Sequence, residues 1–228
     1  MSWKRALAML LIYSSASIAA EEVTAPELAK INDAKRWQTI NAICDTSLEG
    51  GKTVVRLRPT GQAKTPSDVA VALVEGVKFT EGTLEIDLKG KGPYEASFLG
   101  LAFNVVDGKT FEAVYFRPFN FVRDGASEGQ TFRSHAIQYV AWPDHTWEKL
   151  RKGNPGVYES TVNPVPDPSG WFHVRIEVTK LKVKVWVNDG KQPCLVVDRL
   201  GSHDKGKVGL WVDSKEGSFR SLRIAQSN

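Results

Sequence analysis

Two short segments of this 228-residue chain carry residue pairs with the type and spacing that acid–base chemistry needs. Glu85 and Asp87 alternate with apolar residues in GTLEIDL, so both lie on one face of an expected strand, about 7 Å apart. Asp144 and His145 are neighbours in a polar loop between two tryptophans. Either pair is a candidate for the two-group chemistry of glycoside cleavage. The alternative for both pairs is an ordinary solvent-exposed polar surface.

Other catalytic patterns are missing from the sequence. It has no GxSxG nucleophile pattern, and neither cysteine has a nearby histidine. The four histidines are dispersed and no CxxC pattern accompanies them, so we expect no metal site and no cofactor.

A central hairpin brings other chemically useful residues together. Asp107-Gly108 joins two apolar-rich runs, 98–106 and 110–117, and Asp-Gly between such runs is a strong hairpin signal. One face of this hairpin is an expected core layer. The predicted register pairs Leu99 with Phe116, Leu101 with Val114, and Phe103 with Glu112.

The opposite face of the hairpin is a candidate binding surface. Its glycine and alanine residues form a floor that leaves room for a ligand, with Tyr115 and Arg117 at one end and Asn104 on the same face. A guanidinium at this position can bind a carboxylate, including that of a uronic acid, or form an internal salt bridge.

The segment after the hairpin adds three candidates for ligand binding. Gln138 lies in an expected strand whose phase is open, and His135 with Tyr139 is the alternative. Trp142 and Trp147 flank the polar loop, and exposed rings of this kind stack on sugars. Together with the polar groups, two rings give affinities on the order of micromolar to millimolar. Tryptophans that plug the ends of a sheet are the alternative.

The N-terminus has the pattern of a signal peptide. Lys4 and Arg5 precede an apolar run, and small residues then lead to a cleavage zone that ends residues 1–20. We therefore expect an extracytoplasmic protein, periplasmic or secreted, without a membrane anchor; an uncleaved signal anchor is the alternative. In an oxidising compartment, Cys44 and Cys194 are either a disulfide or two buried free thiols.

The rest of the chain predicts an all-β fold. A short capped helix at 26–36, within a lead-in at 21–47, precedes short alternating segments separated by Gly, Asp, Asn and Pro. This spacing is typical of a two-sheet antiparallel β-sandwich of the jelly-roll type, here over 48–228. The net charge of +4 is scattered, so we expect solvated faces rather than a surface for nucleic acid.

Four segments follow one another in an order that resembles the concanavalin A-like lectin and glucanase domains. They are GTLEIDLKG, FLGLAFNVVDGKTFEAVYFRPFN, WFHVRIEVTKLKVKVWVNDG and GKVGLWVDSKEGSFRSLRI. Within this group the chain is most similar to the bacterial exported 3-keto-disaccharide hydrolase-like domain, itself similar to laminin-G-like modules. The resemblance covers roughly 48–225 and implies two antiparallel sheets, one of them concave. It implies no catalytic pair, because Gly90 stands where laminarinase-type glucanases have their general acid.

These observations predict an exported β-sandwich that binds an oligo- or polysaccharide on the concave face of one sheet. A glycoside hydrolase or lyase of the 3-keto-disaccharide type is the alternative function. A laminin-G-like protein-interaction module is the further alternative.

Overall fold

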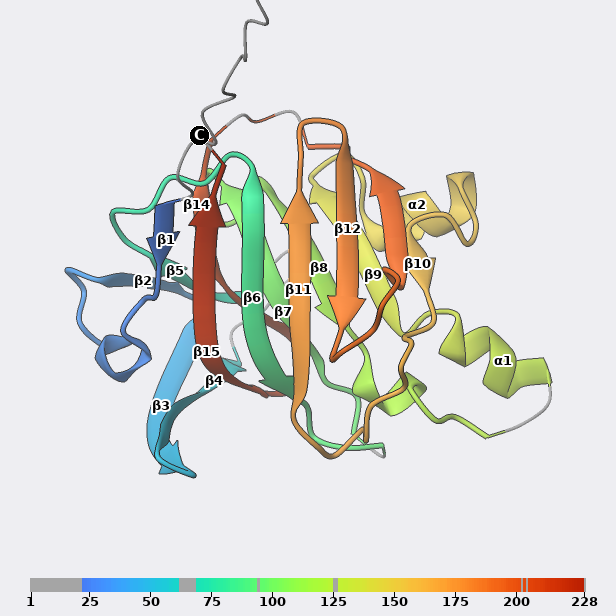
Figure 1. Cartoon of the computed structure of the whole chain (residues 1–228), viewed down its shortest axis with the longest axis horizontal. Helices are drawn as coiled ribbons and strands as arrows, with labels where there is room; N and C mark the ends of the chain where they lie inside the picture. The colour runs from blue at the N-terminus through green and yellow to red at the C-terminus, as the bar shows by residue number, and fades with distance from the viewer. Residues whose placement is uncertain are drawn as a thin grey trace, which may run out of the picture.

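The computed structural model describes residues 22–61, 69–93, 95–124, 127–201, 203 and 205–227. The expected signal peptide lies outside these residues. The described chain forms two antiparallel sheets that pack face to face, which confirms the predicted all-β sandwich (Figure 1).

The first sheet, sheet A, has eight strands and lies toward the viewer in Figure 1. Its order is β13-β12-β11-β6-β15-β4-β3, with β1 paired to β15. The strands are β1 (Glu22–Thr24), β3 (Ala42–Glu49), β4 (Lys52–Pro59), β6 (Gly82–Lys89), β11 (Phe172–Val178), β12 (Lys182–Val187), β13 (Leu195–Asp198) and β15 (Gly217–Gln226). In β6 and β11, fully buried apolar residues alternate strictly with half-buried ones, so this sheet has one core face and one wet face.

The second sheet, sheet B, has seven strands in the order β10-β9-β8-β7-β14-β5-β2. The strands are β2 (Trp37–Ile40), β5 (Ala70–Val74), β7 (Phe98–Val105), β8 (Phe111–Phe116), β9 (Ile137–Trp142), β10 (Glu159–Ser160) and β14 (Lys207–Asp213). Every residue of β8 is buried, in contrast to the alternation in sheet A. Sheet B is therefore covered over much of both faces.

Phenylalanine rings join the two sheets in the core. The ring of Phe116 in β8 meets that of Phe172 in β11 edge to face, with 5.3 Å between their centroids. The predicted hairpin register is confirmed, because β7 and β8 pair Leu99 with Phe116 and Phe103 with Glu112. At the turn, the Asp107 carboxylate accepts hydrogen bonds from two backbone N–H groups.

Helices make up a small part of the described chain. The expected N-terminal helix is a single 3₁₀ turn, η1 (Leu28–Lys30), and the lead-in around it supplies β1, β2 and most of β3. A second 3₁₀ turn, η2 (Pro118–Asn120), follows β8 directly. Two further helices, α1 (Ser127–Arg133) and α2 (Trp147–Gly153), lie on the β9–β10 side of the molecule (Figure 1).

The two cysteines are free thiols, so the disulfide expectation is wrong and the alternative of free thiols holds. Cys44 lies in β3 at one edge of sheet A, and Cys194 directly precedes β13 at the other edge. Six strand spacings separate these edges, about 25–30 Å, which is far beyond the Cα separation that a disulfide tolerates. Burial raises the pKa of each thiol to about 11, so both are poor nucleophiles at neutral pH.

A buried carboxylate fixes the turn end of β8. Glu112 is 2% exposed and accepts hydrogen bonds from Nε and Nη2 of Arg199 at 3.1 and 3.0 Å. It also accepts hydrogen bonds from the hydroxyl of Tyr139 at 2.7 Å and from Nδ2 of Asn104 at 2.9 Å. The protein itself therefore compensates this buried negative charge.

We expect Glu112→Ala to lower the free energy of unfolding by about 3–5 kcal/mol, because it leaves the Arg199 guanidinium buried without a counter-ion. Urea unfolding followed by circular dichroism measures this loss. The matched control is Glu177→Ala, which breaks the half-exposed pair with Lys184 and should cost less than about 1 kcal/mol. Equal losses in the two variants would contradict the structural role of Glu112.

Candidate functional site

The outer face of sheet B is packed rather than open over most of its width. Gly100, Ala102 and Ala113 are buried, so the small-residue floor expected from the sequence offers no room for a ligand. The rings of Tyr115 and Trp211 stack with 4.7 Å between centroids, and Gly100 lies between these two residues in the strand register. The expectation that a ligand lies on this floor is therefore wrong.

The opening that remains, here called the aromatic pocket, lies where η2, α1 and α2 meet the outer face of sheet B. Its volume is about 320 Å³. Five aromatic side chains line it: Phe98, Tyr115, Phe119, Phe132 and Trp147. Four ionisable side chains line it as well: Arg117, His135, Arg151 and Asp213. Three of the predicted ligand-binding residues, Tyr115, Arg117 and Trp147, are thus brought together.

Arg117 is the most deeply placed charge of the aromatic pocket. It stands at the end of β8, where Pro118 begins η2, and it is only 5% exposed. Its Nη1 donates to the carbonyl of His135 at 2.6 Å, and its Nη2 donates to the hydroxyl of Tyr115 at 2.9 Å. Burial lowers the pKa of Arg117, yet a guanidinium remains charged at neutral pH. Both acceptors are neutral groups, because burial raises the pKa of Tyr115 to about 12.

The second arginine of the aromatic pocket is already paired. Nε and Nη2 of Arg151 donate to the buried carboxylate of Glu159 at 3.0 and 2.6 Å, and the guanidinium lies 4.9 Å from the Trp147 ring centroid. His135 Nδ1 lies 2.8 Å from the same carboxylate. Burial nevertheless lowers the pKa of His135, which leaves a neutral imidazole at pH 7.

Asp213 is a residue of this pocket that the sequence analysis missed. Burial raises the pKa of its carboxyl group, although Ser214 donates a hydrogen bond to Oδ1 at 3.3 Å. It reaches the pocket because β14 pairs with β7 and sets Asp213 opposite Phe98. No local pattern in the sequence signals this long-range pairing.

Gln138 and Asn104 have different positions from those expected. Gln138 lies beside Tyr115 in the register, so the phase that places it on the outer face is the one observed, but its Nε2 donates to the carbonyl of Tyr158 beneath the surface. Asn104 has a φ of 50°, and its side chain turns to Glu112 on the core face of the hairpin. The expected alternation fails there because a left-handed backbone breaks the period of two.

Trp142, Asp144 and His145 line a second pocket of about 360 Å³ near the other end of β8, together with Glu112. The ring of Trp142 stacks on Phe111, with 6.2 Å between centroids. Phe111 and Arg117 are six residues apart, so the two pockets lie about 20 Å from each other along the strand. The predicted loop and hairpin residues therefore form two sites rather than one.

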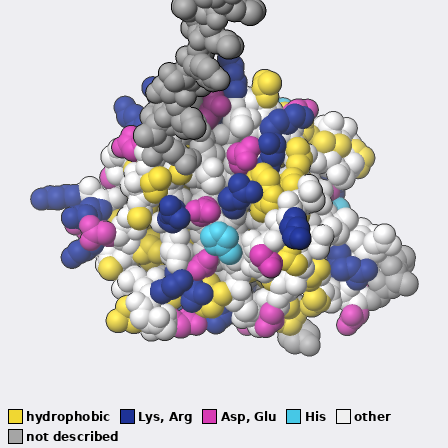
Figure 2. Space-filling model, in the orientation of Figure 1, with side chains coloured by type: hydrophobic (Ala, Val, Ile, Leu, Met, Phe, Trp, Pro, Cys, Tyr) yellow, Lys and Arg dark blue, Asp and Glu magenta, His cyan; other side chains and the backbone are white. Residues whose placement is uncertain are grey.

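Glu85 and Asp87 lie on the outer face of sheet A, away from both pockets. Asp87 Oδ1 is 2.9 Å from His173 Nδ1, and its Oδ2 accepts a hydrogen bond from Arg220 at 3.1 Å. Glu85 pairs with Arg223 at 3.5 Å. Figure 2 shows a histidine among acidic and basic side chains in the middle of this face. Both carboxylates are thus members of an ion-pair network across neighbouring strands.

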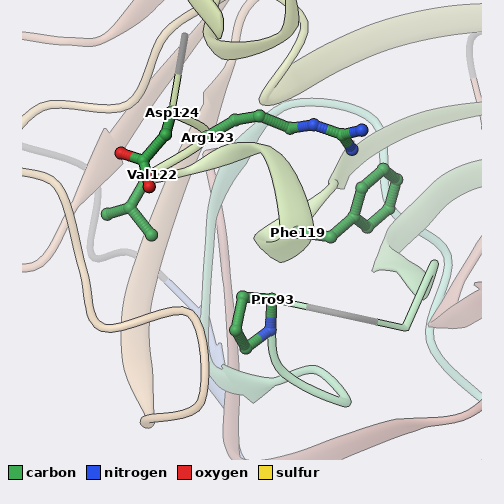
Figure 3. A pocket seen from close by; sticks show the side chains of 5 residues that line it. All are labelled: Pro93, Phe119, Val122, Arg123 and Asp124. Atoms are coloured by element: carbon green, nitrogen blue, oxygen red, sulfur yellow. The ribbon is translucent and has the colours of Figure 1, made fainter.

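Phe119 also borders a neighbouring hollow of about 490 Å³, which Pro93, Val122, Arg123 and Asp124 complete. Figure 3 shows the Phe119 and Arg123 side chains extending to the same side of this hollow. The Arg123 guanidinium in turn lies 4.2 Å from the ring centroid of Phe132. The aromatic pocket and this hollow therefore share Phe119 of η2 and adjoin each other there.

The family of the chain follows from its sequence. Residues 32–225 match the 3-keto-alpha-glucoside-1,2-lyase-like domain, and the chain belongs to this family. The resemblance to the 3-keto-disaccharide hydrolase-like domain is thereby confirmed. No curated protein sequence matches the chain.

Solved structures share the fold. The carbohydrate-binding module CBM66 from Bacillus subtilis has a TM-score of 0.57 at 14% identity, over 86% of this chain and 98% of that one. A protein with a galectin-like fold from Bacillus subtilis has a TM-score of 0.54 at 12% identity, over 92% and 97%. The β-glucanase of Bacillus licheniformis has a TM-score of 0.52 at 10% identity, over 92% and 99%. At these identities the likeness establishes the two-sheet sandwich fold alone, and the site must be derived from the residues of this chain.

None of the helices in the described part of the chain is both long and apolar enough to cross a membrane.

The network on sheet A predicts a pH-dependent stability. Although burial opposes it, hydrogen bonds from His173 and Arg220 lower the pKa of Asp87 to about 2, so its contribution is present above 3.8 and is lost as the pH falls toward 2. The hydrogen bond to Asp87 raises the pKa of His173, so its contribution is present below 6.5 and is lost as the pH rises through the folded-state pKa. The pair is therefore strongest at mildly acidic pH.

We expect His173→Asn to destabilise the protein by about 1 kcal/mol at pH 5 and by less at pH 9, as measured by urea unfolding. The control is His203→Asn, an exposed histidine of the β13–β14 loop, which should behave alike at both pH values. A loss that is the same at pH 5 and pH 9 for His173→Asn would rule out the charged pair.

Proposed function

We propose that the protein is an exported domain that binds an oligo- or polysaccharide at the aromatic pocket. The observation that carries this proposal is a set of buried polar atoms without a hydrogen-bond partner around the pocket. Asn120 Oδ1 is one of them and lies in the lining. Two more lie beyond the lining: Trp211 Nε1, on the ring that stacks on Tyr115, and Gln138 Oε1, in the strand next to Tyr115. Buried polar groups are rarely left unpaired, and a hydroxyl-rich ligand both donates and accepts hydrogen bonds.

Two exposed rings at the mouth of the pocket support a saccharide ligand. Trp147 in α2 and Phe132 in α1 are each 37% exposed, which is unusual for large aromatic side chains in a packed domain. Stacking a pyranose on one face of such a ring removes about 100 Å² of apolar area from water. At about 25 cal/mol per Å² this gives roughly 2–3 kcal/mol before entropic costs.

The family and the fold support the same function. The family is named after a reaction of a keto-glucoside, and one structural neighbour is described as a carbohydrate-binding module. Export is supported by the basic, apolar and small-residue pattern of residues 1–20.

We expect Trp147→Ala to weaken the binding of a recognised saccharide at least about tenfold, because it removes an exposed stacking ring. Isothermal titration calorimetry against a panel of oligosaccharides measures the affinity. The matched control is Trp186→Ala on sheet A, where the ring lies 3.7 Å under the Arg175 guanidinium, and it should bind as the unaltered protein does. Equal affinity of the two variants would place the ligand elsewhere.

The second candidate function is a lyase of the keto-glucoside type in the same pocket. A 1,2-elimination needs one group to remove the proton at C2 and another to protonate the departing oxygen at C1. His135, neutral at pH 7, suits the first role, and Asp213, whose pKa is raised by burial, suits the second. The observation that favours this function is the presence of both groups in one pocket of a lyase-like family member.

For this second function we expect Asp213→Asn to slow release of the leaving group from a 3-keto-α-glucoside by about 10²-fold or more, as measured by chromatography of the products. Asp45→Asn, at the exposed edge of sheet A, is the matched control and should leave the rate unchanged. A rate that is unaffected by Asp213→Asn, with loss on Asp144→Asn instead, would assign the reaction to the second pocket.

A further inference from the structure

We propose that the aromatic pocket selects acidic saccharides and that Arg117 binds the carboxylate of a hexuronate residue. This inference rests on the proposed saccharide binding and adds the chemical class of the ligand. It follows from the charge of Arg117. Within the described chain, this buried charge lacks the oppositely charged partner that the other buried charges have.

Arg117 is a buried cation whose charge is not neutralised by a direct partner. A guanidinium has five N–H donors, and the two contacts of Arg117 use neutral acceptors, the Tyr115 hydroxyl and the His135 carbonyl. None of the ion pairs among the described residues includes Arg117. Because a charge held away from water is costly unless it is paired, an anionic ligand supplies the partner that the protein lacks.

The other charged groups around the pocket do not fill this role. Glu159 is held by the bidentate contact from Arg151 and by His135. Asp213 is hydrogen-bonded to its neighbour Ser214 and makes no ion pair with Arg117. Burial raises the pKa of Asp213, and the charge of Arg117 opposes this rise without a direct ion pair between the two groups.

The shape and lining of the pocket favour a sugar carboxylate over a small inorganic anion. The planar guanidinium fork matches the two oxygens of a carboxylate. The guanidinium lies against the rings of Phe98 and Tyr115, at 5.6 and 4.9 Å from their centroids. The exposed rings of Trp147 and Phe132 in the same lining suit the C–H face of a pyranose. A volume of about 320 Å³ lies in the range of small-ligand pockets.

The experiment compares hexuronate oligosaccharides with their own methyl esters, because esterification removes the charge and keeps the sugar. The panel contains trimers of galacturonate, mannuronate, guluronate and glucuronate, each acid paired with its ester, and neutral glucose and xylose oligomers. Calorimetry on the mature protein should show that at least one acid binds, and that its ester binds at least about tenfold more weakly. An equal affinity for acid and ester would overturn the inference.

Two variants test the residue itself. Arg117→Gln should abolish the preference for acid over ester, whereas Arg117→Lys should keep a reduced preference, because it retains the charge without the fork. Circular dichroism shows whether each variant folds. If Arg117→Gln does not fold, the comparison of acid with ester in the unaltered protein decides the inference. A folded Arg117→Gln variant that keeps the full preference would overturn the assignment to Arg117.

Failure of this inference differs from failure of the proposed function. Binding of neutral oligomers with no preference for any acid would overturn the acidic ligand and leave saccharide binding intact. Binding of no member of the panel would overturn both.

Discussion

Strand β8 carries a buried charge near each of its ends, and the packing of sheet B depends on how each charge is accommodated. Glu112, at the turn end, faces the core and is held by Arg199, Tyr139 and Asn104. Arg117, just past the other end, faces outward and has only neutral acceptors. Because the desolvation of an ion is expensive, the paired Glu112 stabilises the fold, whereas Arg117 lacks an ion-pair partner among the described residues.

The same criterion separates the other candidate residues of the chain. Glu85 and Asp87 have the spacing of catalytic carboxylates, yet each has a basic partner on neighbouring strands of sheet A. Although burial opposes it, hydrogen bonds from His173 and Arg220 lower the pKa of Asp87, which suits stability rather than proton transfer. Asp213 shows the opposite behaviour, since burial raises its pKa inside a pocket.

The sequence predicted the parts of this structure that depend on local periodicity. The alternation of β6 and β11 and the hairpin register at Leu99 and Phe116 need only the period of two and an Asp-Gly turn. The site depends on long-range packing, which no local pattern carries. The left-handed backbone of Asn104, the ring of Trp211 against Tyr115, and the arrival of Asp213 through β14 were therefore not predictable.

The structural neighbours clarify why the fold alone does not define the ligand. They share the sandwich with this chain at 10–14% identity, so the fold persists while most residues differ. On the outer face of sheet B, the rings of Tyr115 and Trp211 stack, and Tyr115 lines a pocket with Arg117, which has no ion-pair partner among the described residues. The ligand class must therefore follow from the charges and rings of this chain.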